Sequence, residues 1–308
     1  MIKYLIKFLW IVLIIPIILK RIRYRKMRNN ILNAILNFTN DSEQKLKAAT
    51  NQDNRLHALG ESLEEYIKDI FAGTLGNNDE ERMKIQDAYF SYGGGKNNPP
   101  DAVIMNGDAI EVKKLKRVED VPLNSSFPKA KLYRDDKRIS DDCRNCEGDT
   151  WTEKDIIYAI GICNDESLSS MVLVYGSVYC AKRECYESMF STIKKCISTS
   201  GYQLLEASKE LAHINAVDPL GITYFRARGM WGISHPLEVF KYLEDDRTWH
   251  NHTLIAIIPS EKYESFQNKE IFEEKVSQIQ GLKISDKQVK NPNNTAKLID
   301  IKLITYDK

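Results

Sequence analysis

The sequence predicts a mixed α/β protein in which a central β-sheet is flanked by helices. Short apolar runs bounded by polar residues, at Ile156 to Cys163 and Met171 to Tyr175, are typical of buried strands. Apolar residues recur at helical spacing from Leu56 to Phe71, and Asp79 to Tyr89 predicts a further helix. Strands and helices alternate along the chain, as they do in α/β folds.

The composition of the 308 residues is that of a folded globular protein, with 43% hydrophobic and 28% charged residues. The net charge of +1 conceals an asymmetry. Residues 1–26 hold seven Lys or Arg and no acid, and the remainder has six more acids than bases. An acidic body counts mildly against nucleic-acid binding, although a basic cleft can lie in an acidic protein. The six cysteines lack the paired spacing of secreted disulfide-bonded proteins, which predicts a reducing compartment, so we expect a cytoplasmic protein.

A β-hairpin is predicted from Asp101 to Met105 and Ala109 to Lys114, two apolar runs joined by a tight turn. Pro99-Pro100 favours an extended entry, because proline fixes its own φ and disfavours helix in the residue before it. Asn106-Gly107 tolerates positive φ, which is a common signal of a short hairpin.

The loop length of this hairpin decides which charges share a face. A two-residue loop would place Asp101 and Glu111 on opposite faces of the hairpin. A three-residue loop over residues 106–108, with Gly107 as the left-handed residue, places Asp101 opposite Lys113, with Glu111 on the same face. We predict the three-residue loop, because it alone brings the three charges together.

Burying two carboxylates and a lysine on one half-covered face costs free energy, and a divalent cation bound by the carboxylates would offset that cost. Mg²⁺ takes oxygen ligands from one or two carboxylates and keeps several waters. Asp101 and Glu111 are therefore the predicted metal ligands, with a backbone carbonyl near Val112. Lys113 would orient or deprotonate the attacking water, while the metal stabilises charge on the phosphate. An ordinary hairpin with solvated charges is the alternative that the pattern alone leaves open.

This Pro-Asp…Glu-x-Lys arrangement is that of the PD-(D/E)xK nucleases, and its surroundings resemble one family of them. The residues that carry the resemblance are Leu63–Asp69, Asn98–Asp101, Asp108–Lys114, Leu123–Lys129, Lys154–Gly161 and Asp218–Tyr224. In this order they resemble the NgoPII-type family of type II restriction endonucleases. The resemblance implies a restriction-endonuclease-like core, Mg²⁺-dependent cutting of double-stranded DNA at GGCC, and a cognate DNA methyltransferase. A palindromic target is matched most simply by a homodimer.

The helix before the hairpin often presents a glutamate to the metal site in this superfamily, and Glu64 best fits that place. Glu64 lies at the margin of the apolar stripe, three and seven residues before Ile67 and Phe71. Glu65 and Glu61 are alternatives, and a solvated helix face explains Glu64 equally well on helical geometry alone.

A loop after the hairpin is a candidate for DNA contact. Its polar side chains, an amide, two hydroxyls and an ammonium, are suitable hydrogen-bond donors to phosphates. They belong to Asn124, Ser125, Ser126 and Lys129. An ordinary polar loop would have a similar composition.

A second candidate DNA-binding stretch runs from Gly221 to Trp231. Tyr224, Arg226 and Arg228 share one face if the stretch is a strand. Arginine pairs with guanine O6 and N7, each pair being worth ~1–3 kcal/mol of discrimination. We predict Arg226 and Arg228 as readers of the guanines. Phosphate contact or a surface salt bridge is the alternative.

The N-terminal stretch forms a unit of its own, residues 1–26, before an endonuclease domain of residues 27–308. Residues 1–19 are apolar apart from two lysines and are just long enough to span a bilayer, with basic residues following. Met27 as the true start is the interpretation we favour over a real membrane anchor.

Cys143 and Cys146 have the spacing of half a zinc site. Cys180 and Cys185 are a loose candidate for the other half, so free, partly buried thiols are the favoured interpretation.

The rest of the chain predicts further elements of the α/β layer. They are a helix covering the sheet (Glu184 to Ser198), a strand (Leu254 to Ile258), a helix (Glu264 to Ile279), a linker around Asn291–Asn294, and a final strand (Lys297 to Tyr306).

Two other functions remain open from the sequence. One is a nuclease of the same fold that acts on damaged or branched DNA. The other is a membrane-anchored binding protein without enzymatic activity, in which the carboxylates are structural.

Overall fold

The computed structural model describes residues 30–46, 55–95, 98–164, 167–199, 201 and 210–308, with the side chains of residues 55–61 and 246 excepted. Within these residues, nine strands form one sheet in the order β1-β2-β3-β6-β7-β11-β13-β12, with β5 paired to β6. The strands are β1 (Phe90–Tyr92), β2 (Ala102–Ile104), β3 (Ala109–Leu115), β5 (Lys131–Tyr133), β6 (Glu153–Asn164), β7 (Ser167–Tyr175), β11 (Leu254–Pro259), β12 (Leu282–Asn291) and β13 (Asn294–Tyr306). The β3–β6 and β7–β11 pairs are parallel and the others antiparallel, so the predicted mixed sheet is confirmed.

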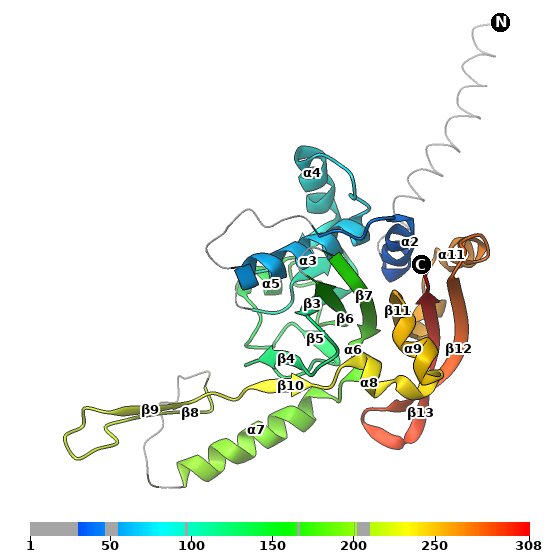
Figure 1. The fold of residues 1–308 in the computed structure, drawn as a ribbon. Coiled ribbons are helices and arrows are strands. Elements are labelled where there is room, and N and C mark those ends of the chain that lie inside the picture. The colour runs from blue at the N-terminus through cyan, green and yellow to red at the C-terminus, as the bar shows by residue number, and fades with distance from the viewer. Residues whose placement is uncertain (1–29, 47–54, 96–97, 165–166, 200, 202–209) are drawn as a thin grey trace, which may run out of the picture.

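The helices of the described residues surround this sheet (Figure 1). They are α2 (Ile31–Asn40), α3 (Arg55–Ala72), α4 (Asp79–Tyr89), α5 (Asp141–Asn145), α6 (Gly176–Tyr179), α7 (Arg183–Ser198), α8 (Pro236–Val239), α9 (Asp246–Asn251), α10 (Ser260–Glu264) and α11 (Lys269–Val276), with a 3₁₀ turn at Lys241–Leu243. Two small sheets pair β4 (Val121–Asn124) with β10 (Trp231–Ile233) and β8 (Ala212–Asn215) with β9 (Tyr224–Ala227).

The core lies along β6, β7 and β11, whose central residues are buried in unbroken runs. Strands covered on both faces show this continuous apolar pattern rather than alternation. Helix α3 packs on β3, and its Leu63 lies close to the backbone of Gly161. A Cβ atom on Gly161 would lie 2.9 Å from Leu63 Cδ2 and 2.9 Å from Leu168 Cδ1, so the absence of a side chain lets Leu63 of α3 pack against the sheet.

Several predicted elements are confirmed, and three differ from the prediction. The helix predicted from Glu264 to Ile279 is only Lys269–Val276, because Glu264 ends the separate helix α10. The helix at Asp79–Tyr89 has the predicted bounds, and α3 extends the predicted helix by one residue at each end. The predicted linker around Asn291–Asn294 is instead the turn between the paired strands β12 and β13. Helix α7 forms where expected but does not cover the sheet, since none of its residues is buried. In Figure 1 it projects from the body, as does the β8–β9 hairpin.

No helix among the described residues combines the length and apolarity that a bilayer span requires. Residues 1–26, where an anchor was considered, lie outside the described part of the chain.

Candidate active site and DNA-contacting surface

The β2–β3 hairpin forms with a three-residue loop, but its register differs from the prediction. Ala102 pairs with Ile110, and Ile104 N donates to Asp108 O, so the loop is residues 105–107. Asn106, with φ 54°, takes the left-handed conformation expected of Gly107. Asp101 therefore does not lie opposite Lys113.

The cause of the shift is the carboxylate of Asp108, which is buried rather than part of the turn. It accepts hydrogen bonds from Tyr175 Oη at 2.7 Å and Lys262 Nζ at 2.6 Å. These contacts place Asp108 at the entry to β3 and move the loop back by one residue. A sequence pattern does not reveal them, because both partners lie far along the chain.

The three charged side chains still converge. Glu111 and Lys113 share a face of β3, and Lys113 Nζ donates to Glu111 Oε1 at 2.6 Å. The Asp101 carboxylate accepts a hydrogen bond from Val112 N at 2.6 Å, which fixes it beside the same strand. The hairpin therefore presents two carboxylates and one ammonium in a single cluster.

The pKa values of this cluster reflect its burial. Burial raises the pKa of Asp101 well above its ordinary value, and the neighbouring charge of Glu111 raises it further, against the lowering effect of Lys113. Burial lowers the pKa of Lys113, but Glu111 and Asp101 outweigh it and the net shift is upward. Lys113 is consequently a stable cation at neutral pH in this arrangement.

Glu64 on α3 belongs to the same electrostatic cluster. Burial raises its pKa, Lys68 and Lys113 lower it, and the charge of Glu111 raises it. Glu65, the alternative, instead forms an ion pair with Lys68 within α3 and another with Arg82 that joins α3 to α4. The side chain of Glu61 is outside the described part of the structure. Of the two glutamates that can be compared, Glu64 is the one that interacts with the hairpin.

The cluster has the donor set that a small divalent cation requires. Glu111 is 8% exposed, and its Oε2 atom is buried without a hydrogen-bond partner. A buried carboxylate oxygen without a partner is costly unless a cation or water satisfies it. Among the described residues, no group of three or more His, Cys, Asp or Glu is arranged to hold a metal. Two carboxylates with several waters are nevertheless the usual protein ligands of Mg²⁺.

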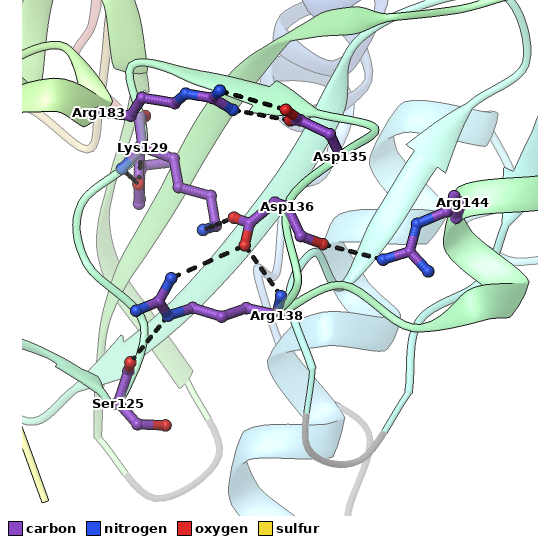
Figure 2. Close-up of polar contacts among 8 residues, drawn as sticks. Ser125, Lys129, Asp135, Asp136, Arg138, Arg144 and Arg183 are labelled. Atoms are coloured by element: carbon purple, nitrogen blue, oxygen red, sulfur yellow. Dashed lines mark hydrogen bonds and ion pairs between the residues drawn. The ribbon is translucent and has the colours of Figure 1, made fainter. Parts of the chain in front are cut away.

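The predicted DNA-contacting loop is only partly available to a ligand. Asn124 and Ser125 are exposed and Ser126 is partly buried. Lys129 is 4% exposed, and its ammonium donates to Asp136 at 2.5 Å, as Figure 2 shows. The structure does not present Lys129 to the surface, because the buried Asp136 carboxylate needs its charge.

Arg138 is a further cation beside this loop. It donates to Ser125 O at 3.4 Å (Figure 2). Its guanidinium lies 4.6 Å from the centre of the Phe127 ring. The backbone N of Arg138 donates to the Asp136 carboxylate, which fixes the backbone at Arg138. Arg138 is thus held beside the exposed hydroxyl and amide groups of the loop.

Tyr224 and Arg226 lie on strand β9 and Arg228 follows it, close to the predicted arrangement. All of them are at least partly exposed, Tyr224 by 67%. Both arginines bind Glu210, with Arg226 Nη2 and Arg228 Nε at 2.6 and 2.8 Å from its Oε1. Hydrogen bonds from Arg226 and Arg228 lower the pKa of Glu210 to about 2. Glu210 was missed because it lies 16 residues before Arg226, with no local pattern to link them.

Cys143 lies in the short helix α5, and Cys146 follows directly after it. Cys143 is fully buried, and burial raises the pKa of its thiol to about 12. No group of three or more candidate ligands that includes this pair is arranged for a metal among the described residues.

Comparison with known proteins decides the family. The model of the NgoPII restriction endonuclease family matches residues 29–290. The type II restriction enzyme NgoPII of Neisseria gonorrhoeae is 42% identical over 281 residues, covering 90% of this chain and 99% of the relative. The chain belongs to the NgoPII restriction endonuclease family. No solved structure matches it.

Membership of the NgoPII family makes this protein a DNA-cleaving restriction endonuclease of type II. A binding protein without enzymatic activity is excluded as its function. The matched range includes helix α3, the β2–β3 hairpin and the β8–β9 hairpin.

Proposed function

We propose that this restriction endonuclease cuts double-stranded DNA at GGCC, with Mg²⁺ held by Asp101 and Glu111. The observation that carries the assignment is the buried Glu111 Oε2 without a partner, beside a second carboxylate whose pKa burial raises. A cation bound by the two carboxylates would relieve both features. When bound there, Mg²⁺ supplies positive charge that stabilises the phosphate oxygens during cleavage.

The side chains of the cluster have separate roles. Asp101 is oriented by Val112 N, and Glu111 is oriented by Lys113, so both carboxylates are held before substrate arrives. Lys113, as a cation, donates hydrogen bonds to the scissile phosphate and positions the attacking water. Glu64 accepts a proton or a water hydrogen bond from the α3 side of the cluster. Its raised pKa suits that role.

The exposed donors supply the DNA contacts. Asn124 and Ser125 bind phosphate oxygens, and Ser126 supports the loop. Arg226 and Arg228 read guanines in the major groove, with Tyr224 beside them. Lys129 contributes by fixing Asp136, and through it the loop and Arg138, rather than by touching phosphate.

A palindromic GGCC site is matched by a homodimer in which each subunit cuts one strand. The functional partner in the cell is a DNA methyltransferase that protects the same sequence. Membership of a restriction endonuclease family supports both proposals.

The test is incubation of unmethylated duplex DNA carrying GGCC with the full chain and Mg²⁺, beside Asp101→Ala and Lys113→Ala. Discrete fragments from the parent and none from either variant are expected. A duplex with GGCC methylated, a duplex with one substituted base pair, and a branched DNA without the site serve as controls. Cutting of the branched DNA alone would assign the cluster to a structure-specific nuclease instead, and equal cutting by the variants would remove the residue assignment.

A further inference from the structure

The register of the β2–β3 hairpin is not decided by which side chains are buried. The ladder between the two strands is short and consists of the pairs Ala102–Ile110 and Val103–Ala109. A slip of one residue would turn every side chain to the other face, whereas a slip of two residues keeps the faces unchanged. The register predicted from the sequence differs from the observed one by such a slip and has a loop of the same length. Contacts made by the loop must therefore select between the two registers.

The choice of register matters for the candidate metal site. A slip of two residues moves Glu111 by ~7 Å along the hairpin relative to Asp101, since each residue of a strand adds ~3.4 Å. Ligand oxygens lie ~2.1 Å from Mg²⁺, so two of them on one ion are at most ~4 Å apart. The slip is larger than that span, and the register therefore sets whether both carboxylates reach one ion.

A buried ion pair from outside the hairpin holds the loop. Glu147 Oε1 accepts hydrogen bonds at 2.8 Å from the backbone N of Asn106 and at 2.8 Å from Ser91 Oγ on β1. Its other oxygen accepts from Lys154 Nζ on β6 at 2.7 Å, and Lys154 Nζ also donates to Gly107 O at 3.2 Å. The pair thus holds the backbone of two successive loop residues.

This ion pair is closed to solvent. The side chains of Glu147 and Lys154 are 9% and 6% exposed. Burial raises the pKa of Glu147, but the hydrogen bonds that its carboxylate accepts outweigh burial, and the net shift is downward. A loop displaced by one residue would take Asn106 N and Gly107 O away from the pair. Two buried charged groups would then lose part of their hydrogen bonds, which is costly.

We propose that Glu147 is a positioning residue for DNA cleavage, which with Lys154 fixes the hairpin loop in the register that brings Asp101 and Glu111 to one metal ion. Glu147 acts through the loop rather than on the ion. It works together with Asp108, which contacts with other elements hold at the start of β3. This role rests on the metal ligands of the proposed function, so the test needs one readout with Mg²⁺ and one without it.

The first readout is amide hydrogen exchange without Mg²⁺ or DNA, which reports on local opening. In Glu147→Ala the amides of the hairpin should exchange at least about tenfold faster relative to those of β7 than in the parent. The Val112 amide, which donates to the Asp101 carboxylate, is the most informative of them. A role limited to overall stability would change the hairpin and β7 together.

The matched control is Glu244→Ala, which removes a carboxylate that lies 2.7 Å from the ring of the buried His252. It should lower the free energy of unfolding as the loss of another buried contact does. It should have no selective effect on the exchange of the hairpin, because neither residue contacts the loop.

The second readout is the Mg²⁺ dissociation constant, obtained from the rise in melting temperature along a Mg²⁺ series. Removing a group that orients metal ligands typically weakens metal binding by about 10- to 100-fold, and we expect this of Glu147→Ala. Glu244→Ala should bind Mg²⁺ as the parent does. In DNA cleavage, Glu147→Ala should lose kcat and keep the parental KM, since a buried residue that acts through the loop does not contribute to DNA binding.

Glu147→Gln is a milder variant that serves if Glu147→Ala does not fold. An amide has a single oxygen, so it does not accept from Asn106 N and Lys154 at once with separate oxygens, as the carboxylate does. Its hairpin exchange and its Mg²⁺ affinity should therefore lie between those of the parent and those of Glu147→Ala.

Equal hairpin exchange in the parent and the Glu147 variants would overturn the proposal. Faster exchange with an unchanged Mg²⁺ affinity would overturn it too, because the loop would then not govern the metal site. A parent that gains no stability from Mg²⁺ would overturn the metal ligands of the proposed function. A parent that does gain it, beside a Glu147→Ala that binds Mg²⁺ equally well, would overturn the role of Glu147 alone.

Discussion

The Asp101 carboxylate accepts a 2.6 Å hydrogen bond from the backbone nitrogen of Val112, which joins the entry of the hairpin to the strand that carries Glu111 and Lys113. The bond orients one oxygen of Asp101 along β3 without using another charged side chain. Charge and orientation at this position can therefore be separated by substitution.

Asp101→Asn retains an oxygen that accepts from Val112 N but removes the charge. We expect cleavage to fall at least about 100-fold, as when other electrostatic contacts to a transition state are removed. Thermal stability should be equal to that of the parent or higher, because a buried carboxylate beside Glu111 is no longer present. Asp101→Ala should be equally inactive but less stable. Cleavage rates and melting temperatures of the two variants check this, and an active Asn variant would contradict it.

Mg²⁺ should stabilise the folded protein through Glu111. At a concentration 100 times the dissociation constant, a ligand that binds only the native state contributes ~2.7 kcal/mol, which raises the melting temperature by several degrees. Glu111→Gln should abolish this gain, whereas Glu119→Gln, on an exposed carboxylate, should keep it. The readout is a melting curve with and without Mg²⁺ in the absence of DNA. An unchanged Mg²⁺ gain in Glu111→Gln would move the ligand assignment to other residues.

Glu210 should govern how selectively Arg226 and Arg228 act, since it binds both side chains. In Glu210→Gln the two arginine side chains lose their charged partner and become free to adopt other conformations. We expect tighter binding to unrelated duplex DNA and about tenfold less discrimination against a site with one changed base pair. Binding to both duplexes across a salt series measures this, with Glu238→Gln as the control carboxylate. Unchanged discrimination would argue that the arginines do not read bases.

Lys129 should matter for folding rather than for DNA affinity. Lys129→Met leaves the Asp136 carboxylate without its ammonium, and breaking a buried pair costs about 3 kcal/mol or more. Lys131→Met, whose pair with Glu153 is more exposed, should cost less than about 1 kcal/mol. Denaturant unfolding compares the two variants. A reduced salt dependence of DNA binding in folded Lys129→Met would instead indicate a phosphate contact.

Acid should destabilise the protein through His235, which is 1% exposed. Burial lowers the pKa of His235 to about 4, below the ordinary value of 6.5. Because the unfolded chain then binds the proton first, stability falls as pH drops from about 6.5 towards 4, by about 2 kcal/mol at pH 5. His235→Asn can still accept from Leu237 N but does not titrate, so its pH profile should be flatter. Denaturant unfolding across a pH series compares the parent with His235→Asn, and equal slopes for the two proteins would contradict the assignment to His235.

Elements with strong periodicity were predictable from the sequence. Helices α3 and α4 and the strands at Ile156 and Met171 formed close to their expected bounds, because their pattern of burial repeats over several turns or residues. The three charges of the hairpin also converged. They converged despite the wrong register because each residue of β2 is displaced by two residues along β3 relative to the prediction. A displacement by two leaves every side chain on the same face of the hairpin.

Features set by distant partners were not predictable. The turn shifted because Asp108 binds Lys262, 154 residues away. Lys129 was taken for a surface donor because its partner Asp136 looks like any loop acid in the sequence. The amphipathic pattern of α7 indicated that an apolar side exists, but periodicity does not say whether that side meets the same chain or another.

The bare backbone at Gly161 has a consequence beyond packing. With Leu63 resting against it, the depth at which α3 is seated depends on one residue in the middle of β6 having no side chain. Glu64 follows Leu63 on the same helix, so the contact of Leu63 with β6 also sets how close Glu64 lies to the hairpin. A methyl group at Gly161 would press on the terminal methyl groups of Leu63 and Leu168, so Gly161→Ala is expected to change the seating of α3, and with it the position of Glu64, without altering any residue proposed to contact DNA.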